Sequence, residues 1–420
     1  MRKKVLVRAP ALSRTGYGEH SRFVLRSLRK HEDKFDIFLD NTNWGQSGWI
    51  FRDDEERRWL DTIIAKTMLH INNKGQFDAS VQVTIPNEWQ SIAPVNVGVT
   101  AGIETTQVAP QWIEKSFVVD KIITTSNHSK QVYENTSYEA HHKETKAVIK
   151  DFKCEKPIEV VHYPVKEVEA AEIKLDLETD FNFLVVAQWG PRKNIENTIK
   201  WFIEEFVDNP NVGLVLKLFY RGGSIVDRVE LENSVKKLLN EYPQKQCKIY
   251  LLHGDMTVQE MTAIYQHPKI KALISLTHGE GFGLPLYEAV YNALPVIAPD
   301  WSGHVDFLYK PTKNKKGKIK NKSHFAKVEY EIGPIPEHVV WEGVLEKHSM
   351  WCYPQQGSYK MRIREVHKDH GRFKSQAKKL QTWVKKEFSS EKQHDMMANS
   401  ILDAIEKDSV VPEKSVVNYE

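Results

Sequence analysis

Short runs of apolar residues alternate with longer amphipathic stretches along most of this chain. The apolar runs predict buried strands, and stretches with apolar residues three or four positions apart predict helices that cover them. Strands that alternate with helices indicate an α/β fold built on parallel sheets. The predicted strands are residues 4–8, 36–39, 79–84, 97–100, 122–126, 154–165, 181–187, 214–219, 271–276 and 296–298. The predicted helices are residues 21–30, 130–134, 195–206, 260–265, 359–368, 373–388 and 391–405.

A charged stretch divides this pattern into two halves. Residues 166–180 are rich in Lys, Glu and Asp, and strand periodicity restarts directly after them. A chain of 420 residues is long enough for two lobes with separate cores. We therefore expect an N-terminal lobe over 1–165, a linker over 166–180, a C-terminal lobe over 181–385, and a final helix and tail over 386–420.

Residues 271–298 carry the strongest chemical signal. A predicted strand leads into the sequence GEGFGLP, a short helix follows, and a second strand closes the unit. The N-terminus of such a helix leaves backbone N–H groups free to bind an anion such as a diphosphate. Two carboxylates, Glu280 and Glu288, flank the start of the helix, and carboxylates suit hydroxyl-rich groups such as ribose or a sugar. The segment predicts a nucleotide-sugar site.

The sequence Glu280-GFGLPLY-Glu288 resembles the E-x7-E signature of family 4 glycosyltransferases, which have the GT-B fold. The resemblance implies two Rossmann-like lobes that face a central cleft, with C-terminal helices that cross back to the N-terminal lobe. It implies that Glu280 contacts hydroxyls of the transferred sugar and that Glu288 holds the ribose of the donor. The backbone that it places against the diphosphate belongs to Gly281, Phe282, Gly283 and Leu284.

A second candidate for phosphate binding follows the predicted strand at 181–187. Arg192 and Lys193 stand at a helix start, where cations are unfavourable, so their position favours a bound diphosphate that both side chains clamp. The R-K-N sequence resembles the diphosphate-clamping segment of family 4. Gln188 stands where many relatives carry an arginine, so either Arg192 compensates or the contacts are rearranged. Lys217, inside an apolar strand, also needs a partner, which the donor region or Glu280 would supply.

The N-terminal half offers weaker candidates. Gly16 and Gly18 form a glycine-rich turn after the first strand, which lets backbone approach a ligand, and GT-B enzymes commonly have such a loop across the cleft. Glu104 and His128 follow predicted strands, and ligands bind at the carboxyl ends of parallel strands. Both are candidates to bind the acceptor or the donor sugar. His128 has the alternative of being a surface residue beside the N-cap of the helix at 130–134.

Composition further limits the class of protein. With 40% hydrophobic and 27% charged residues the chain is typical of a soluble protein, and no apolar run approaches the roughly 18–20 residues of a membrane span. The three scattered cysteines, Cys154, Cys247 and Cys352, have no metal-binding spacing and favour a reducing cytoplasm. We find no Asp-x-Asp motif at a strand end. The family resemblance implies retaining transfer without a metal or other cofactor, from a nucleoside-diphosphate sugar.

The acceptor is less well determined. Residues 310–322 hold seven lysines and no acid, and a second basic set lies in 368–386. Such runs are commonly solvated faces, but they also suit a phosphate backbone. The segments VTIPNEW (residues 83–89) and TAGIETT (residues 100–106) resemble family 4-like proteins of large tailed phages. This resemblance favours a hydroxymethylated pyrimidine in double-stranded phage DNA as acceptor, in the host cytoplasm. The alternative acceptor is a glycan or lipid-linked sugar of a cell envelope. A nucleotide-sugar epimerase and a non-enzymatic nucleic-acid-binding protein are the other two hypotheses.

Overall fold

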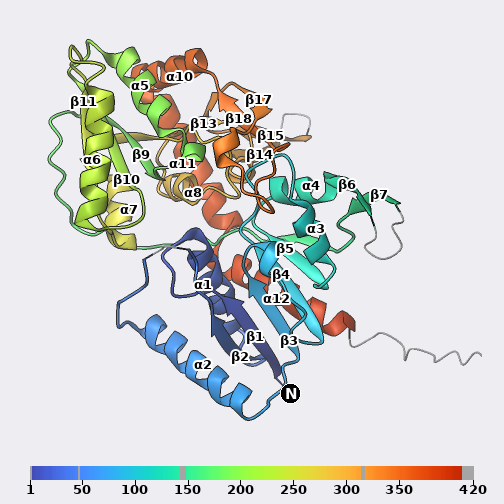
Figure 1. Cartoon of the computed structure of the whole chain (residues 1–420). Helices are drawn as coiled ribbons and strands as arrows, with labels where there is room; N and C mark the ends of the chain where they lie inside the picture. Colours follow the sequence, from blue (N-terminus) through green and yellow to red (C-terminus); the bar gives the residue numbers. More distant parts are fainter. Residues whose placement is uncertain (1, 46–47, 142–147, 314–316, 409–420) are drawn as a thin grey trace, which may run out of the picture.

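Two α/β lobes make up the protein. The computed structural model describes residues 2–45, 48–141, 148–313 and 317–408, and Figure 1 shows the N-terminal lobe below the C-terminal lobe. Each lobe contains a sheet of six strands. All pairings within these two sheets are parallel. The predicted α/β architecture with parallel sheets is therefore confirmed.

The N-terminal sheet has the strand order β2-β1-β3-β4-β5-β8. Two of its inner strands, residues 79–83 and 95–100, are buried along their whole length because helices cover both faces of a parallel sheet. Its strands are β1 (Lys3–Ala9), β2 (Phe35–Asn41), β3 (Ala79–Val83), β4 (Val95–Thr100), β5 (Lys121–Thr124) and β8 (Ile158–Val160). Its helices are α1 (Gly16–Arg29), α2 (Glu55–Asn72), η1 (Pro86–Glu88), α3 (Pro110–Ser116) and α4 (Asn127–Asn135). A hairpin of β6 (Ser137–His141) and β7 (Val148–Lys153) lies at its side.

The C-terminal sheet has the order β11-β10-β9-β12-β13-β16. Its strands are β9 (Phe181–Gln188), β10 (Val212–Phe219), β11 (Lys248–Leu252), β12 (Ile270–Ile274), β13 (Val296–Pro299) and β16 (Ala326–Val328). Its helices are η2 (Pro191–Lys193), α5 (Ile195–Phe206), α6 (Ile225–Leu239), α7 (Val258–Gln266), α8 (Leu284–Tyr291), α9 (Val305–Leu308), η3 (Glu337–Val339), α10 (Gln356–Lys368) and α11 (His370–Glu387). Two antiparallel hairpins are added to it, β14 (Tyr309–Lys313) with β15 (Ile319–Ser323) and β17 (Tyr330–Pro334) with β18 (Met350–Pro354).

The last helix, α12 (Ser390–Asp408), crosses back to the N-terminal lobe and lies along α1 (Figure 1). Polar contacts fix its position. Ser27 Oγ of α1 is 2.8 Å from His394 Nδ1, and Lys121 Nζ donates to the Ser400 carbonyl at 3.0 Å. The predicted return of the C-terminal helices is confirmed. None of the described helices is long and apolar enough to cross a membrane.

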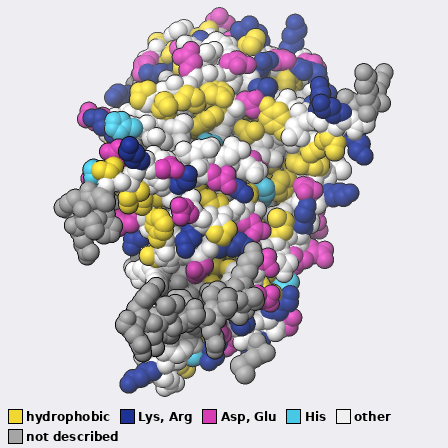
Figure 2. All heavy atoms as spheres, turned by 90° about the vertical axis from the view of Figure 1, so that its right-hand side faces the viewer, with side chains coloured by type: hydrophobic (Ala, Val, Ile, Leu, Met, Phe, Trp, Pro, Cys, Tyr) yellow, Lys and Arg dark blue, Asp and Glu magenta, His cyan; other side chains and the backbone are white. Residues whose placement is uncertain are grey.

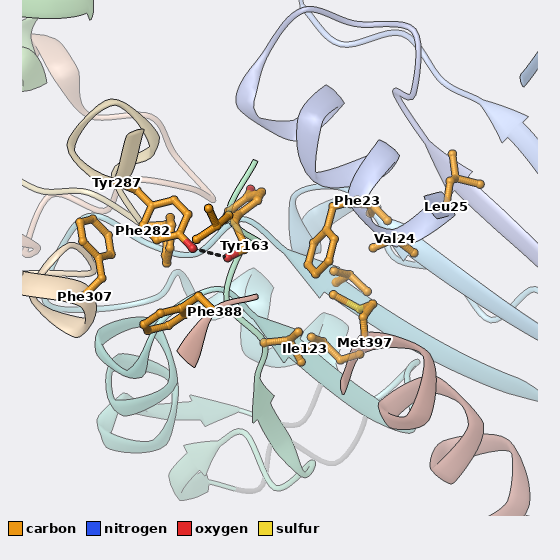
Figure 3. Close-up of a cluster of buried hydrophobic side chains, with 14 of the residues drawn as sticks. Phe23, Val24, Leu25, Ile123, Tyr163, Phe282, Tyr287, Phe307, Phe388 and Met397 are labelled. Carbon is orange, nitrogen blue, oxygen red and sulfur yellow. Dashed lines mark hydrogen bonds between the residues drawn. The ribbon is translucent and has the colours of Figure 1, made fainter. Parts of the chain in front are cut away.

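An aromatic core joins the lobes behind the cleft, as Figure 3 shows. Tyr163, in the segment after β8, has its ring centroid 5.9 Å from that of Phe23 in α1 and 5.0 Å from that of Phe282 in the C-terminal lobe. Tyr287 of α8 donates its hydroxyl hydrogen to the Tyr163 carbonyl at 2.9 Å. Phe388, between α11 and α12, packs against Tyr287 from the other side. The lobes therefore share one hydrophobic core at their hinge side.

Two predicted elements were wrong in extent. The strand predicted over 154–165 is only Ile158–Val160, because Pro157 and Pro164 have no N–H to donate to a sheet. The first helix begins at Gly16 instead of residue 21, because the Thr15 side chain caps it by accepting from the Gly18 N–H at 3.2 Å. Residues 161–180 contain neither helix nor strand. The domain limits given above stay a prediction.

The shared core generates a prediction about stability. Phe388→Ala should lower the free energy of unfolding by about 3–5 kcal/mol, because it leaves a cavity beside Tyr287. Phe51→Ala, the same substitution at a side chain that is 81% exposed, should change it by less than about 0.5 kcal/mol. Urea unfolding followed by fluorescence measures both. Equal effects would show that the two lobes do not depend on this core.

Candidate functional site

The carboxyl ends of strands from both lobes face each other across the interface. Glu104 follows β4 of the N-terminal lobe, Arg192 and Lys193 follow β9, and Glu280 follows β12. Loops at this end of a parallel sheet are where α/β proteins bind ligands. The structure brings all four side chains together into one cluster of charges.

Glu280 is the centre of this cluster and is only 5% exposed. Its Oε2 accepts from Arg192 Nη1 at 3.0 Å, and its Oε1 accepts from Lys193 Nζ at 2.5 Å. Arg192 Nη2 also reaches Glu104 Oε1 at 3.3 Å, which links the lobes. The two cations and two carboxylates sum to zero charge.

The loops around the cluster hold its members in place. Arg192 donates a second bond to the Gly279 carbonyl at 2.6 Å, and its own carbonyl accepts from the His278 N–H at 2.8 Å. The backbone N–H of Glu280 donates to Ser302 Oγ at 2.9 Å. Burial opposes ionisation of Glu280, but the charges of Lys193 and Arg192 outweigh it and lower the pKa of Glu280 to about 2. Glu280 is therefore a carboxylate at neutral pH.

The glycines of this segment meet the backbone of the other lobe. A Cβ on Gly279 would lie 2.1 Å from the Glu104 carbonyl oxygen, and one on Gly281 would lie 2.3 Å from the Ala101 carbonyl oxygen. No side chain fits at such distances, so glycine is needed for this close approach. Gly283 has a φ of +95° and precedes α8, a second reason for glycine here.

Among the described residues, no acceptor is found for the backbone N–H groups of Gly281, Phe282 and Gly283. These N–H groups belong to the backbone that the family resemblance places against a diphosphate. The side chain of Phe282 has a structural position in the aromatic core, and Leu284 begins α8. The segment therefore offers N–H groups without needing its side chains.

Glu288 lies apart from the cluster, in the middle of α8. The hydroxyl of Tyr265 donates to its Oε2 at 2.8 Å. Burial raises the pKa of Glu288, and the nearby Lys166 and the Tyr265 hydrogen bond oppose this effect. The two glutamates thus have different environments, one with two cations and one with a hydroxyl partner.

Three further candidates have well-defined surroundings. Gly16 is open to solvent, whereas a Cβ on Gly18 would lie 1.9 Å from the Ser13 carbonyl oxygen. Both glycines lie in the first turn of α1, so they stand at the start of the helix after β1 and not in a loop that precedes it. Lys217 is buried and donates to the Gly254 carbonyl at 2.6 Å, so its partner is this carbonyl and not Glu280.

His128 is in the first turn of α4, whose N-cap is Ser126. Its ring centroid is 4.9 Å from that of Trp301. Burial lowers the pKa of His128 to about 4, so the imidazole is neutral at pH 7. Its Nε2 is buried and has no partner among the described residues. A neutral, unpaired ring nitrogen is available to a hydroxyl group of a ligand.

From the sequence, the residues after β13 were assigned no catalytic role, and several of them complete the site. Ser302 holds the Glu280 backbone, and Asp306 joins the lobes by accepting from Asn127 N at 2.7 Å. His162 Nε2 also lies 2.9 Å from Asp306 Oδ2. The only signal was their place at the carboxyl end of a strand in the sequence DWSGHVD.

The space beside the cluster is small. A cavity of about 10 Å³ is lined by Lys193, Thr198, Ser275, Glu280 and Leu286, among others. Such a volume holds about one water molecule. All residues that line it belong to the C-terminal lobe, so this cavity lies within that lobe and not between the two lobes. The described residues contain no group of three His, Cys, Asp or Glu side chains that would hold a metal ion.

Comparison of sequences finds similarity to a mannosyltransferase. The chain is 31% identical over 119 residues to the serotype-specific mannosyltransferase WbdA of Escherichia coli. The matched part is 28% of this chain and only 13% of WbdA, so the chain spans a small part of that relative. No protein-family model matches the chain.

Solved structures show the fold. Sucrose-phosphate synthase (tll1590) from Thermosynechococcus elongatus has a TM-score of 0.60 at 12% identity, over 97% of this chain and 100% of that chain. Alr3699/HepE from Anabaena, solved in complex with UDP-glucose, has a TM-score of 0.54 at 11% identity, over 96% and 100%. The chain has the GT-B fold of these proteins, as predicted.

The ionised state of Glu280 generates a prediction about pH. The folded pKa of about 2 lies below the ordinary 4.5, so pairing stabilises the fold above pH 4.5. This stabilisation, about 3 kcal/mol, is lost as the pH falls from about 4.5 to about 2. The difference in free energy of unfolding between wild type and Glu280→Gln should therefore shrink over that range. Glu155→Gln, at an exposed position, should follow wild type at every pH. A constant difference for Glu280→Gln would contradict the assigned ion pairs.

Proposed function

We propose that this protein is a retaining, metal-independent glycosyltransferase that moves a sugar from a nucleoside-diphosphate sugar to an acceptor hydroxyl. The observation that carries the proposal is the buried cluster of Glu280, Arg192, Lys193 and Glu104 between the lobes of a GT-B fold. Guanidinium and ammonium groups bind phosphate oxygens strongly. The two carboxylates hold these cations in position until a diphosphate replaces them.

Transfer requires stabilisation of the departing nucleoside diphosphate. The bond between the anomeric carbon and the β-phosphate oxygen breaks, and the negative charge moves onto the phosphate. Arg192, Lys193 and the free N–H groups of Gly281 to Gly283 supply fixed positive charge and dipoles there. The acceptor oxygen bonds to the anomeric carbon on the same face, and its proton passes to the leaving phosphate oxygen. This sequence of bond changes needs no separate base.

The remaining candidates bind the substrates in this scheme. Glu280, released from the cations, accepts hydrogen bonds from sugar hydroxyls, and Glu288 accepts from the ribose. Gly16 and Gly18 bring the N-terminal lobe close to the donor, and Lys217 supports the loop at Gly254. Glu104 and His128 face the sugar or the acceptor, with the unpaired His128 Nε2 as a hydrogen-bond partner.

Opening of the lobes is part of the proposal. Because the Arg192–Glu104 ion pair and the hydrogen bond from Asn127 to Asp306 join the lobes beside the cluster, the donor enters after the lobes separate. Separation breaks the Arg192–Glu104 pair, which leaves Arg192 with a free guanidinium edge for the diphosphate. Closure then excludes water from the reaction.

For the acceptor we keep hydroxymethylated pyrimidines of phage DNA as the favoured class, in the cytoplasm of the host. The support is the pair of lysine-rich segments 310–322 and 368–386, of which residues 314–316 lie outside the described residues. A base would have to leave the duplex to reach the cleft. The alternative acceptor, a cell-envelope glycan or lipid-linked sugar, has its support in the similarity to the mannosyltransferase WbdA. An epimerase, or a protein that only binds nucleic acid, would not need acceptor-binding residues such as Glu104 and His128 next to the ion cluster. These two alternatives are therefore less favoured.

Substitution of Lys193 tests the donor site. Lys193→Ala should lower kcat about 100- to 1,000-fold, because it removes one positive charge from the leaving phosphate. Lys200→Ala removes a lysine from the same lobe, where the side chain pairs with Glu241 on the outside of α5, and should retain wild-type kcat. Nucleoside diphosphate release under saturating donor is the assay. Equal rates for both variants would remove Lys193 from the mechanism.

The activity itself is tested with a panel of nucleotide sugars, with and without hydroxymethylated DNA. We expect nucleoside diphosphate release from one donor, a sharp rise with that DNA, and no change on addition of EDTA. Release that responds to envelope glycans instead would select the alternative acceptor. A changed sugar that stays on its nucleotide would identify an epimerase and contradict transfer.

A further inference from the structure

The two lysine-rich segments, distant in sequence, come together on one surface of the C-terminal lobe. Lys310 of β14 reaches α11, where its Nζ donates to the Lys379 carbonyl at 3.4 Å. The charges of Lys310, Lys322 and Lys379 all act on the buried ring of His324 and, after burial, contribute to lowering its pKa. We call these lysines together with Lys313, Lys320 and Lys378 the basic surface. It lies on the side of the molecule that Figure 2 faces, where dark blue Lys and Arg side chains line the upper right edge.

The hairpin places like charges beside one another. Lys310 is directly opposite Lys322 in the β14–β15 register, and Lys320 is opposite Thr312 on the same face. Like charges opposite each other in an antiparallel pair are destabilising. The arrangement thus costs folding free energy, and the described residues of the hairpin include no carboxylate that would offset this cost.

Neighbouring lysines differ in having carboxylate partners. Lys327 Nζ pairs with Asp300 at 3.1 Å, and Lys385 Nζ pairs with Glu167 at 3.3 Å. In the part of the chain that the structure describes, no carboxylate pairs with any of the six lysines of the basic surface. The charge of this surface is therefore available to an external anion.

The hairpin also forms a groove. A hollow of about 440 Å³ is lined by Tyr309, Thr312, Lys313, Lys320, Asn321, Lys322, Ser323 and Lys327. Lysine ammonium groups, hydroxyls and an amide are the donors that bind phosphate oxygens in nucleic-acid complexes. The groove suits a phosphate-bearing ligand.

The groove connects directly to the candidate site. Tyr309, at its base, donates its hydroxyl hydrogen to Asp300 Oδ2 at 2.6 Å. Asp300 directly follows β13 and precedes Trp301, which packs on His128, and Ser302, which holds the Glu280 backbone. A polymer on the basic surface therefore passes beside the cleft.

We infer that the basic surface docks the phosphate backbone of double-stranded DNA. This inference rests on the proposed function and identifies where the acceptor of the enzyme binds. A two-stranded ribbon such as β14–β15 fits the major groove of B-DNA, where its exposed lysines reach phosphates on both sides. A membrane surface would require several exposed apolar side chains beside the lysines. Among the described residues of this hairpin, Ile319 is the large apolar residue that is exposed, at 60%. The charge and shape favour a duplex.

The test measures binding of the full-length protein to a labelled 20-bp duplex by fluorescence anisotropy at several salt concentrations. Lys320→Ala/Lys322→Ala should weaken binding about tenfold and reduce the slope of log K against log salt by about 1.8, since each lost phosphate contact changes it by about 0.9. Lys378→Ala/Lys379→Ala should act in the same direction and leaves the hairpin unchanged. Lys236→Ala/Lys237→Ala, with the same loss of charge on exposed residues of α6, should bind like wild type.

Each outcome separates this inference from the proposed function. Donor turnover without DNA should be unchanged in all three double variants, because none of these lysines lies in the ion cluster. If all variants bind the duplex equally, the basic surface is not the docking site, even where donor turnover is normal. If anionic vesicles, and not the duplex, bind in a manner that depends on these lysines, the partner is a membrane and the inference is overturned. Lysine-dependent duplex binding without turnover of any donor supports the surface and contradicts the proposed enzyme.

Discussion

The buried carboxylate of Glu280 constrains the rest of this structure. A charge removed from water costs several kcal/mol unless it is paired and hydrogen-bonded. Arg192 and Lys193, from one loop, meet this requirement, and the Ser302 hydroxyl group from a second loop holds the Glu280 backbone N–H. Because Arg192 also contacts Glu104, the pairing of one side chain ties the closed position of the two lobes to the state of the candidate site. A ligand that takes the place of the Glu280 carboxylate at Arg192 and Lys193 therefore also changes the contact between the lobes.

The glycines around Glu280 serve this same constraint. At the sequence level, a glycine-rich turn before a helix indicates an anion site, and the unpaired N–H groups of Gly281 to Gly283 agree with that role. The structure adds a requirement from the opposite lobe, because Gly279 and Gly281 face carbonyl oxygens of Glu104 and Ala101. A side chain at either glycine would therefore hold the lobes apart as well as disturb phosphate binding.

Sequence patterns predicted local elements well and contacts between distant loops poorly. The helix predicted over 195–206 is α5, Ile195–Phe206, because its apolar periodicity is strong and Asn194 in the left-handed region precedes it. Glu280, Arg192 and Lys193 were predicted as site residues because each follows a strand, and they lie together. The Arg192–Glu104 pair and the Lys217–Gly254 bond were not predicted, because they depend on how loops from separate strands are oriented. The β17–β18 hairpin was missed because its strands are short and partly exposed, which leaves no clear periodicity.

The cations in the cleft and the lysines of the basic surface have different surroundings. This difference suits the two groups to different ligands. In the cleft, each cation has a carboxylate, so the site is neutral as a whole and does not attract phosphate polymers from a distance. A small diphosphate binds there only by exchanging with these carboxylates at close range. On the basic surface, the lysines have no carboxylate partner among the described residues, so their field extends into solvent over about a Debye length, roughly 8–10 Å at physiological salt. In the proposed function, a long polyanion is drawn to the hairpin and the cleft is kept for the donor. Since Asp300 joins the two regions through Tyr309, the proposed docking brings the polymer to the edge of the cleft without competition for Arg192 and Lys193.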